Sequence, residues 1–331
     1  MATVKNVAEI AKVNVSTVSR YLSGELSVTP ETEQRILDAI KQTNYQPNII
    51  AQGLRRGRSR TIVVVAPDIY QPGISGIISG IDRRIQDSRF ILITVMTQGS
   101  SRRELKILRT LSTMMASGVV LIGHPFGQIN STEMIRDAIG MEPSLVYVSR
   151  TFQESNVLEV CPDQLSGMQQ ITDHLIEKGH RSIGLIVGVN EHPDALIKIR
   201  GYKRSLTAHN IEIRDDLILE GFFRPEETRA ATDVLLERNV DAIICTSDLM
   251  GISALQHLQN KKLSIPDDIA VAGYGGTIWA DLVTPKLTTV AVQVEELGQY
   301  AAGLLLDEIE GNDLDSNFAI RPVSLRLGES V

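Results

Sequence analysis

Two groups of residues in this 331-residue chain are suited to binding polar or charged molecules. In the first group, Ser16 and Arg20 stand four residues apart, with Thr17 and Tyr21 beside them, so a helix would present them together. An arginine guanidinium can donate two hydrogen bonds to the O6 and N7 atoms of guanine, which discriminates that base by roughly 1–3 kcal/mol. Arg20 is therefore a candidate for reading DNA bases, although a solvated surface arginine is the alternative.

The second group follows apolar, strand-like runs. At 270–277, "AVAGYGGT" runs from a strand into a glycine-rich turn, which either brings backbone N–H groups close to an anion or only bends the chain. Since the carboxyl ends of parallel strands meet at one edge of a sheet, polar residues at these ends should face a common cleft. The residues expected there are those from Asp68 through Tyr70 to Gln71, then His124, Ser149, Arg150, Asp163, Lys198, Phe223, Ser247 and Asp248, and those from Gly275 to Trp279.

Three of these residues have a second interpretation. His124 precedes a proline and could be an ordinary loop residue. Asp248 could cap the helix that follows it instead of binding a ligand. Trp279, the only tryptophan, could stack on a sugar ring or belong to the core.

The elements around Arg20 are three short predicted helices. Each is preceded by a residue suited to a helix N-cap, namely Thr3, Asn14 and Thr29. Their apolar residues recur at helical spacing and should point inward: Val7, Ile10 and Ala11, then Val15, Val18 and Leu22, then Ile36, Leu37 and Ile40. Two helices joined by a tight turn and supported by a third indicate a helix-turn-helix unit.

A short apolar segment, about 48–56, follows this unit. It is shorter than the ~12–15 residues that an isolated helix needs in water, and Gly53 costs roughly another 1 kcal/mol relative to alanine. We expect it to fold only on DNA, with Leu54 wedged between bases and the arginines of "RRGRSR" (55–60) near phosphates. A merely soluble linker is the alternative for the arginine run.

From residue 61 onward, Val- and Ile-rich runs alternate with amphipathic segments. This repetition predicts buried parallel sheets with helices on both faces, and more than 270 residues of it are too many for one core. The fold class expected is therefore α/β, with an all-α head, a hinge helix and a body of two lobes. Cys161 and Cys245 lie within apolar runs and should be buried thiols.

Composition and charge limit the function. Residues 1–60 hold nine basic and five acidic side chains, whereas the whole chain has a net charge of −7, so a basic head precedes an acidic body. No nucleophile, phosphate-loop or metal motif is present, so we expect neither an enzyme nor a metal or cofactor site. The polar N-terminus lacks a signal sequence and no long apolar run occurs, which predicts a cytoplasmic protein without a membrane partner.

Two stretches carry a specific resemblance: "VAEIAKVNVSTVSRYLSG" (7–24) and "NYQPNIIAQGLRRG" (44–57). They resemble the DNA-binding head and hinge of the lactose/galactose-repressor (LacI/GalR) family of bacterial regulators, and the likeness continues to the C-terminus. The resemblance implies base readers at Val15, Ser16 and Arg20, and a minor-groove leucine at Leu54. The full set of expected DNA contacts is Val15, Ser16, Thr17, Arg20, Tyr21, Asn48, Ala51, Leu54, Arg55 and Arg56.

The same resemblance implies a body like that of a periplasmic sugar-binding protein. Lys198 stands where the family usually has a ligand-binding arginine, while Gly275 and Ser149 stand where it often has aspartates. Two carboxylates are thus replaced, whereas the cations Arg150 and Lys198 are present. This balance favours an anionic ligand, either a sugar phosphate or a sugar acid, over a neutral sugar or nucleoside. The expected effector contacts are Tyr70, His124, Arg150, Lys198, Phe223, Ser247, Asp248, Gly275 and Trp279.

The sequence thus predicts a homodimeric repressor of a carbohydrate-utilisation operon, bound to a palindromic operator and controlled by a small carbohydrate-type effector. Corepression remains open, and a non-regulatory sugar-binding protein is disfavoured because no export signal is seen. The expected domains are the helix-turn-helix at 1–46, the hinge at 47–59 and the effector-binding and dimerisation body at 60–331. Within the body, the first lobe is expected at 60–160 and 291–320, and the second at 161–290 and 321–331.

Overall fold

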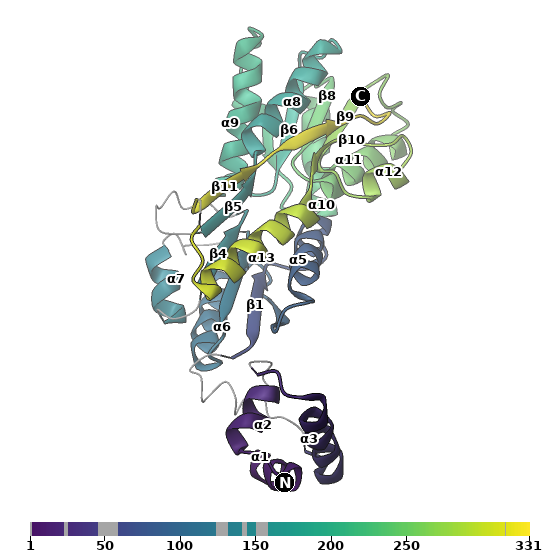
Figure 1. Cartoon of the computed structure of the whole chain (residues 1–331). Helices are drawn as coiled ribbons and strands as arrows, with labels where there is room; N and C mark the ends of the chain where they lie inside the picture. Colours follow the sequence, from purple (N-terminus) through teal and green to yellow (C-terminus); the bar gives the residue numbers. More distant parts are fainter. Residues whose placement is uncertain are drawn as a thin grey trace. The chain divides into compact units, whose positions relative to one another are not determined.

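The computed structural model of the chain forms two compact units, Met1–Ser59 and Arg60–Val331, and each is described by itself (Figure 1). The residues that it describes are 2–22, 26–45, 59–123, 132–140, 144–149, 158–314 and 316–331. The predicted hinge helix at about 48–56 lies outside these residues.

The first unit, the head, contains α1 (Val4–Ala11), α2 (Val15–Leu22) and α3 (Pro30–Thr43), which confirms the three predicted helices. The start of α3 is as expected, because the hydroxyl of Thr29 accepts a hydrogen bond from the Thr32 N–H and Pro30 takes the first helical position. The core consists of Val7, Ala8, Ala11, Val18, Ile36 and Ala39.

Three residues expected to point inward are exposed instead: Ile10, Val15 and Leu37. The small side chains of Ala8 and Ala39 are buried in their place. Helices that approach each other through alanines leave room for few large side chains between them. Apolar spacing alone therefore placed the buried face of each helix only approximately.

The second unit, the body, is built on two six-stranded sheets. The first lobe contains the sheet of order β11-β5-β4-β3-β1-β2, in which every recorded strand pair is parallel. Its strands are β1 (Thr61–Ala66), β2 (Ile91–Met96), β3 (Gly118–Ile122), β4 (Ser144–Val148), β5 (Leu158–Pro162) and β11 (Phe318–Arg321).

The second lobe contains the sheet of order β12-β10-β9-β8-β6-β7, which is parallel except for the pair β10 and β12. Its strands are β6 (Ile183–Val187), β7 (Ile218–Glu220), β8 (Ala242–Cys245), β9 (Ala270–Gly275), β10 (Thr288–Val292) and β12 (Val323–Arg326). These strands confirm the α/β class expected from the apolar runs.

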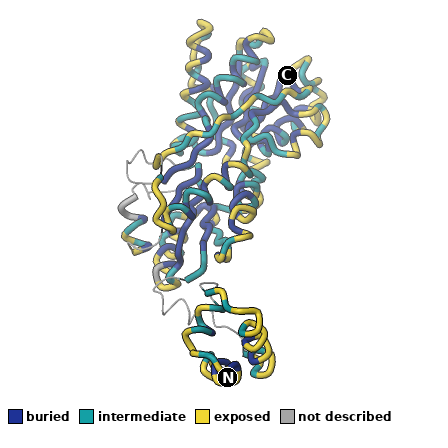
Figure 2. The backbone as a smooth tube through the Cα atoms, viewed as in Figure 1, coloured by how far each residue is buried: buried dark blue, intermediate teal, exposed yellow. Residues whose placement is uncertain are grey.

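Helices cover both faces of each sheet, and the central strands between them are the most buried part of the body (Figure 2). The first lobe has α5 (Pro72–Ile85), α6 (Ser101–Thr113), α7 (Thr132–Ile139) and α13 (Val294–Glu310). The second lobe has α8 (Gln164–Glu177), α9 (Pro193–Ala208), η1 (Asp215–Leu217), α10 (Pro225–Glu237), α11 (Asp248–Asn260) and α12 (Trp279–Leu282).

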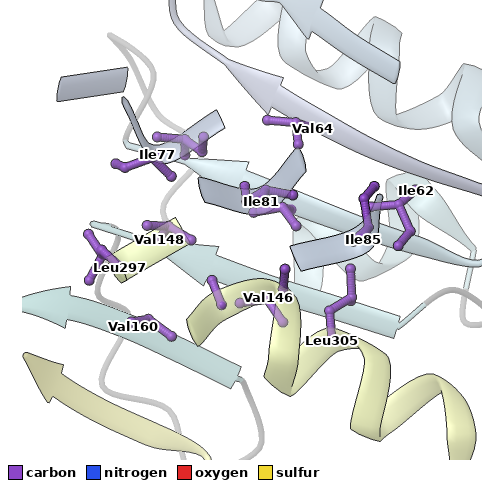
Figure 3. Packing of buried hydrophobic residues seen from close by; sticks show 14 of the residues in the cluster. Ile62, Val64, Ile77, Ile81, Ile85, Val146, Val148, Val160, Leu297 and Leu305 are labelled. Carbon is purple, nitrogen blue, oxygen red and sulfur yellow. The ribbon is translucent and has the colours of Figure 1, made fainter. Parts of the chain in front are cut away.

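The chain passes between the lobes three times, since β5 and α8, β10 and α13, and β11 and β12 are consecutive elements of different lobes. The first lobe is closed by α13, whose Leu297 and Leu305 pack with strand residues and with Ile77, Ile81 and Ile85 of α5 (Figure 3).

Glycines permit the close contact between α5 and α13. A Cβ atom on Gly298 would lie 2.1 Å from the carbonyl oxygen of Ile77, and one on Gly80 would lie 2.0 Å from that of Glu295. Close packing of this kind transmits displacements, because well-packed interfaces deform little. The crossing from β10 into α13 is thus fixed firmly to the first lobe.

Candidate functional site

A cavity in the body is lined by residues of both lobes. The lining residues lie at the carboxyl ends of strands and the first turns of helices, which is where open parallel sheets bind ligands. From the first lobe they include Pro67, Gln71, Ile74, Ile77, Ile122, Ser149, Val294 and Leu297. From the second they include Gln164, His192, Asp194, Lys198, Phe223, Ser247, Asp248, Tyr274, Gly275, Thr277 and Val292.

Two of the crossings between the lobes border this cavity. Pro162 and Gln164 line it at the passage from β5 to α8, and Val292 and Val294 line it at the passage from β10 to α13. A bound molecule would therefore touch the segments through which one lobe is joined to the other.

Asp248 is the most buried acidic group at the cavity, with 1% of its surface exposed. Its Oδ2 atom accepts a hydrogen bond of 2.6 Å from the Thr277 N–H, and its Oδ1 atom accepts one from the Thr289 hydroxyl. Burial raises the pKa of this carboxyl, and the two hydrogen bonds oppose that rise. Asp248 thus joins the start of α11 to the turn after β9 and to β10.

The second interpretation of Asp248, as the cap of the following helix, does not hold, because its neighbour Ser247 caps that helix. The Ser247 side chain is the N-cap of α11 and accepts a hydrogen bond of 3.2 Å from the Met250 N–H. Since the cap is already provided, the buried position of Asp248 beside the cavity needs another explanation.

The glycine turn after β9 is needed for backbone conformation. Gly275 and Gly276 have φ angles of +132° and +68°, and a Cβ atom on Gly276 would lie 2.5 Å from the Cα atom of Ala291. The Gly276 N–H donates to the hydroxyl of Thr289, and the Thr277 N–H donates to Asp248. Both N–H groups thus have acceptors within the chain, which favours the second interpretation of the turn, a bend.

Lys198 of α9 lies over an aromatic ring at the cavity. Its Nζ atom is 4.4 Å from the ring centroid of Tyr274, a cation–π distance. Burial lowers the pKa of Lys198, and the charge of Asp194 opposes this shift. Phe223 supplies a second ring, for which Gly188 leaves room, since a Cβ atom there would lie 2.1 Å from that ring.

The residues expected at the cleft are only partly brought together. The expected residues that line the cavity are Gln71, Ser149, Lys198, Phe223, Ser247, Asp248, Gly275 and Thr277. Tyr70 does not, because its N–H and that of Gln71 bind the Asp68 carboxylate in a turn that leaves Tyr70 82% exposed. His124 and Arg150 lie outside the described residues.

Trp279 fits neither of its two interpretations, stacking on a sugar ring in the cavity or packing in the core. It begins α12, is 40% exposed and is not among the lining residues, so it neither faces the cavity nor belongs to the core. Sequence reasoning missed Gln164, Asp194 and Tyr274 as lining residues, although Gln164 and Tyr274 are direct neighbours of the named positions Asp163 and Gly275.

On the head, α2 presents an exposed face. Val15, Ser16 and Arg20 are exposed, whereas Val18 is buried on the opposite side. Tyr21 is held against α3, because its hydroxyl donates a hydrogen bond of 2.7 Å to Glu33. Thr17 is half-buried. Asn48, Ala51, Leu54, Arg55 and Arg56 lie outside the described residues.

Among the described residues, no helix has both the length and the apolar character that crossing a membrane requires.

Two family models match the chain. Residues 3–48 match the model of bacterial regulatory proteins of the lacI family, and residues 172–331 match that of the periplasmic binding protein-like domain. The head and much of the body are thus each similar to a known type of domain.

Individual proteins are similar over nearly the whole chain. The HTH-type transcriptional repressor CytR of Escherichia coli (strain K12) is 30% identical over 95% of this chain and 92% of that protein. The HTH-type transcriptional repressor PurR of Histophilus somni (strain 2336) is 29% identical over 93% of this chain and 92% of that protein. The solved complex of the transcriptional regulator CelR with cellobiose covers 100% of both chains with a TM-score of 0.76 and 29% identity.

Proposed function

Because the chain belongs to the LacI family of bacterial regulatory proteins, we propose that it represses genes of carbohydrate use by binding a palindromic operator as a homodimer. It is a DNA-binding transcriptional regulator and not an enzyme. A small carbohydrate-type effector in the cavity between the lobes controls the affinity for the operator.

The exposed face of α2 supports the assignment of the DNA-reading surface. A helix that enters the major groove needs exposed polar side chains near its start and a buried opposite face, and α2 has both in Ser16, Arg20 and Val18. The basic head supplies the electrostatic attraction to phosphates, while the acidic body limits binding at unrelated sites.

The homodimer follows from the size of the reading surface. One recognition helix contacts only a few base pairs, which is too few to select a site in a genome. Two copies related by two-fold symmetry double the readout at half-sites about one helical turn apart. The predicted hinge segments, with Leu54 in each copy, would then meet at the centre of the operator.

The cavity supports effector control. The single observation that carries this proposal is that Pro162, Gln164, Val292 and Val294, which border two crossings between the lobes, all line it. A ligand that prefers one arrangement of the lobes shifts the population toward it, and the operator affinity changes by the same coupling free energy, usually about 1–3 kcal/mol. Release from the operator is the direction we propose, with corepression as the alternative.

A sugar acid or sugar phosphate is the effector that we propose. Lys198 is the single lysine or arginine among the described lining residues, and its amine would pair with an anionic group. A neutral sugar or nucleoside is the second candidate, and the observation that favours it is the presence of two carboxylates, Asp194 and Asp248, at the same cavity.

The test starts with selection of binding sites from random double-stranded DNA by the full-length protein. We expect an inverted repeat, bound by two copies of the chain. The operator complex is then titrated with matched neutral sugars, sugar phosphates and sugar acids, and with nucleosides. If selection gives no recurring sequence, DNA readout by α2 is refuted; if no ligand changes the affinity, control through the cavity is refuted.

A further inference from the structure

Two buried polar atoms at the cavity have no hydrogen-bond partner among the described residues: Oε1 of Gln164 and the hydroxyl of Tyr274. Only 6% of Gln164 and 5% of Tyr274 is exposed. Buried polar atoms in folded proteins almost always have a partner, and leaving one unsatisfied is costly. Two such atoms at the wall of one cavity indicate a ligand that completes them.

Both atoms belong to residues beside the first turn of α8. Gln164 is the first residue of α8, and a Cβ atom placed on Gly167, in the same turn, would lie 3.0 Å from the Tyr274 hydroxyl. The Lys198 amine lies over the Tyr274 ring. An ammonium donor, a phenolic hydroxyl and an amide acceptor therefore converge near the start of α8.

We propose that Gln164, Lys198 and Tyr274 form a subsite for a carboxylate and its adjacent hydroxyl, so that the effector is a sugar acid rather than a sugar phosphate. The proposal rests on the function proposed above and deepens it. The Lys198 ammonium and the Tyr274 hydroxyl donate to the carboxylate oxygens. The neighbouring ligand hydroxyl donates to Oε1 of Gln164, which can only accept.

The other charges at the cavity disfavour a phosphate. A phosphate monoester carries about two negative charges at neutral pH, whereas Asp194 and Asp248 line the same cavity and Lys198 is its single lysine or arginine among the described residues. Backbone N–H groups of the turn cannot supplement that lysine, since Gly276 and Thr277 donate within the chain. The single positive charge of Lys198 matches the single negative charge of a carboxylate better than the two charges of a phosphate monoester.

The remaining hydroxyls of a sugar acid also find an acceptor. A Cβ atom on residue 275 would lie 3.4 Å from Oδ2 of Asp248, in contact with that carboxylate, and glycine leaves this position empty. A carboxylate oxygen accepts more than one hydrogen bond, and Oδ2 has an acceptor position beyond the Thr277 N–H.

Isothermal titration of the full-length protein tests this inference with matched triads: glucose, gluconate and glucose 6-phosphate; galactose, galactonate and galactose 6-phosphate. Glucuronate and galacturonate are added, because they place the carboxylate at the other end of the sugar. We expect an acid to bind at least tenfold more tightly than its neutral sugar and its phosphate. Tighter binding of a phosphate or a neutral sugar overturns the inference, as does a panel in which no acid binds.

Two variants locate the subsite. Tyr274→Phe removes one hydroxyl and should weaken binding of the acid roughly tenfold, the equivalent of one hydrogen bond to a charged group. Gln164→Glu places a negative charge beside the carboxylate and should abolish binding. The matched control is Tyr300→Phe, which removes an equivalent hydroxyl from α13 outside the cavity and should leave the affinity unchanged.

Separate readouts distinguish the two proposals. Circular dichroism and thermal unfolding show whether Tyr274→Phe and Gln164→Glu fold, and calorimetry then reports their affinity for the acid alone. If both variants bind an acid as tightly as the wild type, the subsite is refuted while the regulator assignment stands. If the wild type binds an acid but its operator affinity does not change, effector control is refuted while the subsite stands.

Discussion

At the scale of single residues, Arg20 illustrates how exposure and chemistry combine. Its neighbour two positions earlier, Val18, is completely buried, so the helix has a fixed orientation within the head. Arg20 is consequently on the exposed face. A guanidinium in this position can approach a base edge without leaving the helix geometry.

We predict that Arg20→Ala lowers the preference for the selected operator over a sequence with its guanines replaced. The expected loss is roughly 1–3 kcal/mol, because one bidentate contact to guanine is removed. Competitive binding measured by fluorescence anisotropy gives this ratio. Arg35→Ala on α3 removes an exposed arginine of the same unit and should keep the preference. Unchanged discrimination by Arg20→Ala would rule out base reading.

The buried carboxyl of Asp248 should make the free energy of unfolding depend on pH. Because burial raises its pKa above the ordinary value of 3.8, the folded chain holds this proton more tightly than the unfolded chain. The stability gained from the proton is complete below the unfolded pKa and is lost as pH rises through the folded pKa. In the Asp248→Asn variant the side chain does not titrate, so this pH-dependent loss of stability does not occur.

The free energy of unfolding of the wild type, relative to Asp248→Asn, should therefore fall from about pH 4 upward, by at most about 1.4 kcal/mol per pH unit. Denaturant unfolding of both proteins at a series of pH values measures the difference. Parallel pH profiles for the two proteins would show that Asp248 does not titrate differently on folding.

At the scale of elements, the turn between β9 and α12 depends on its two glycines. Gly276 combines a left-handed backbone conformation with contact against Ala291 of β10, so it faces both backbone strain and a steric clash on substitution. Gly311, which ends α13 with a φ of +76°, has the same type of backbone conformation but open space around it.

Gly276→Ala should accordingly destabilise the body by more than Gly311→Ala. We expect about 1 kcal/mol for Gly311→Ala, from the left-handed conformation alone, and at least 1 kcal/mol more for Gly276→Ala. Urea unfolding of the two variants measures both values. Equal losses would mean that β10 moves aside at little cost.

At the scale of the whole molecule, the basic head and acidic body make operator binding dependent on salt. If a dimer contacts about 6–10 phosphates, its affinity should fall roughly 10³–10⁵-fold between 50 and 200 mM salt, because counterions are released on binding. Anisotropy titrations at several salt concentrations give the slope. A slope corresponding to one or two phosphates would contradict the dimeric DNA-binding surface that we propose.

The predicted hinge should separate the two binding activities. Leu54→Ala removes the proposed minor-groove wedge and should weaken binding of the selected operator, while the affinity of the body for its effector stays the same. Operator titration and calorimetry on the same preparation test this. If Leu54→Ala weakened both affinities equally, the role of Leu54 would not be confined to DNA binding.

The sequence by itself determined the elements and the class of protein. Apolar runs of four to six residues, amphipathic helices and the helix starts at Thr29 and Pro30 are local signals, so they predicted the α/β body and the three-helix head. The stretches at 7–24 and 44–57 are similarly local, and they gave the family. Side-chain direction was less certain, as the exposed Ile10, Val15 and Leu37 show.

The tertiary structure decided which side chains form the site. Whether Trp279 or Gln164 reaches the cavity depends on how α8, α12 and the strands pack, and residues far apart in the chain set that packing. The glycine turn could bring N–H groups to an anion, but the Gly276 N–H donates to Thr289 and the Thr277 N–H donates to Asp248. A hydrogen-bond partner 29 residues away leaves no trace in a local pattern, because its position is fixed only when the sheet is assembled.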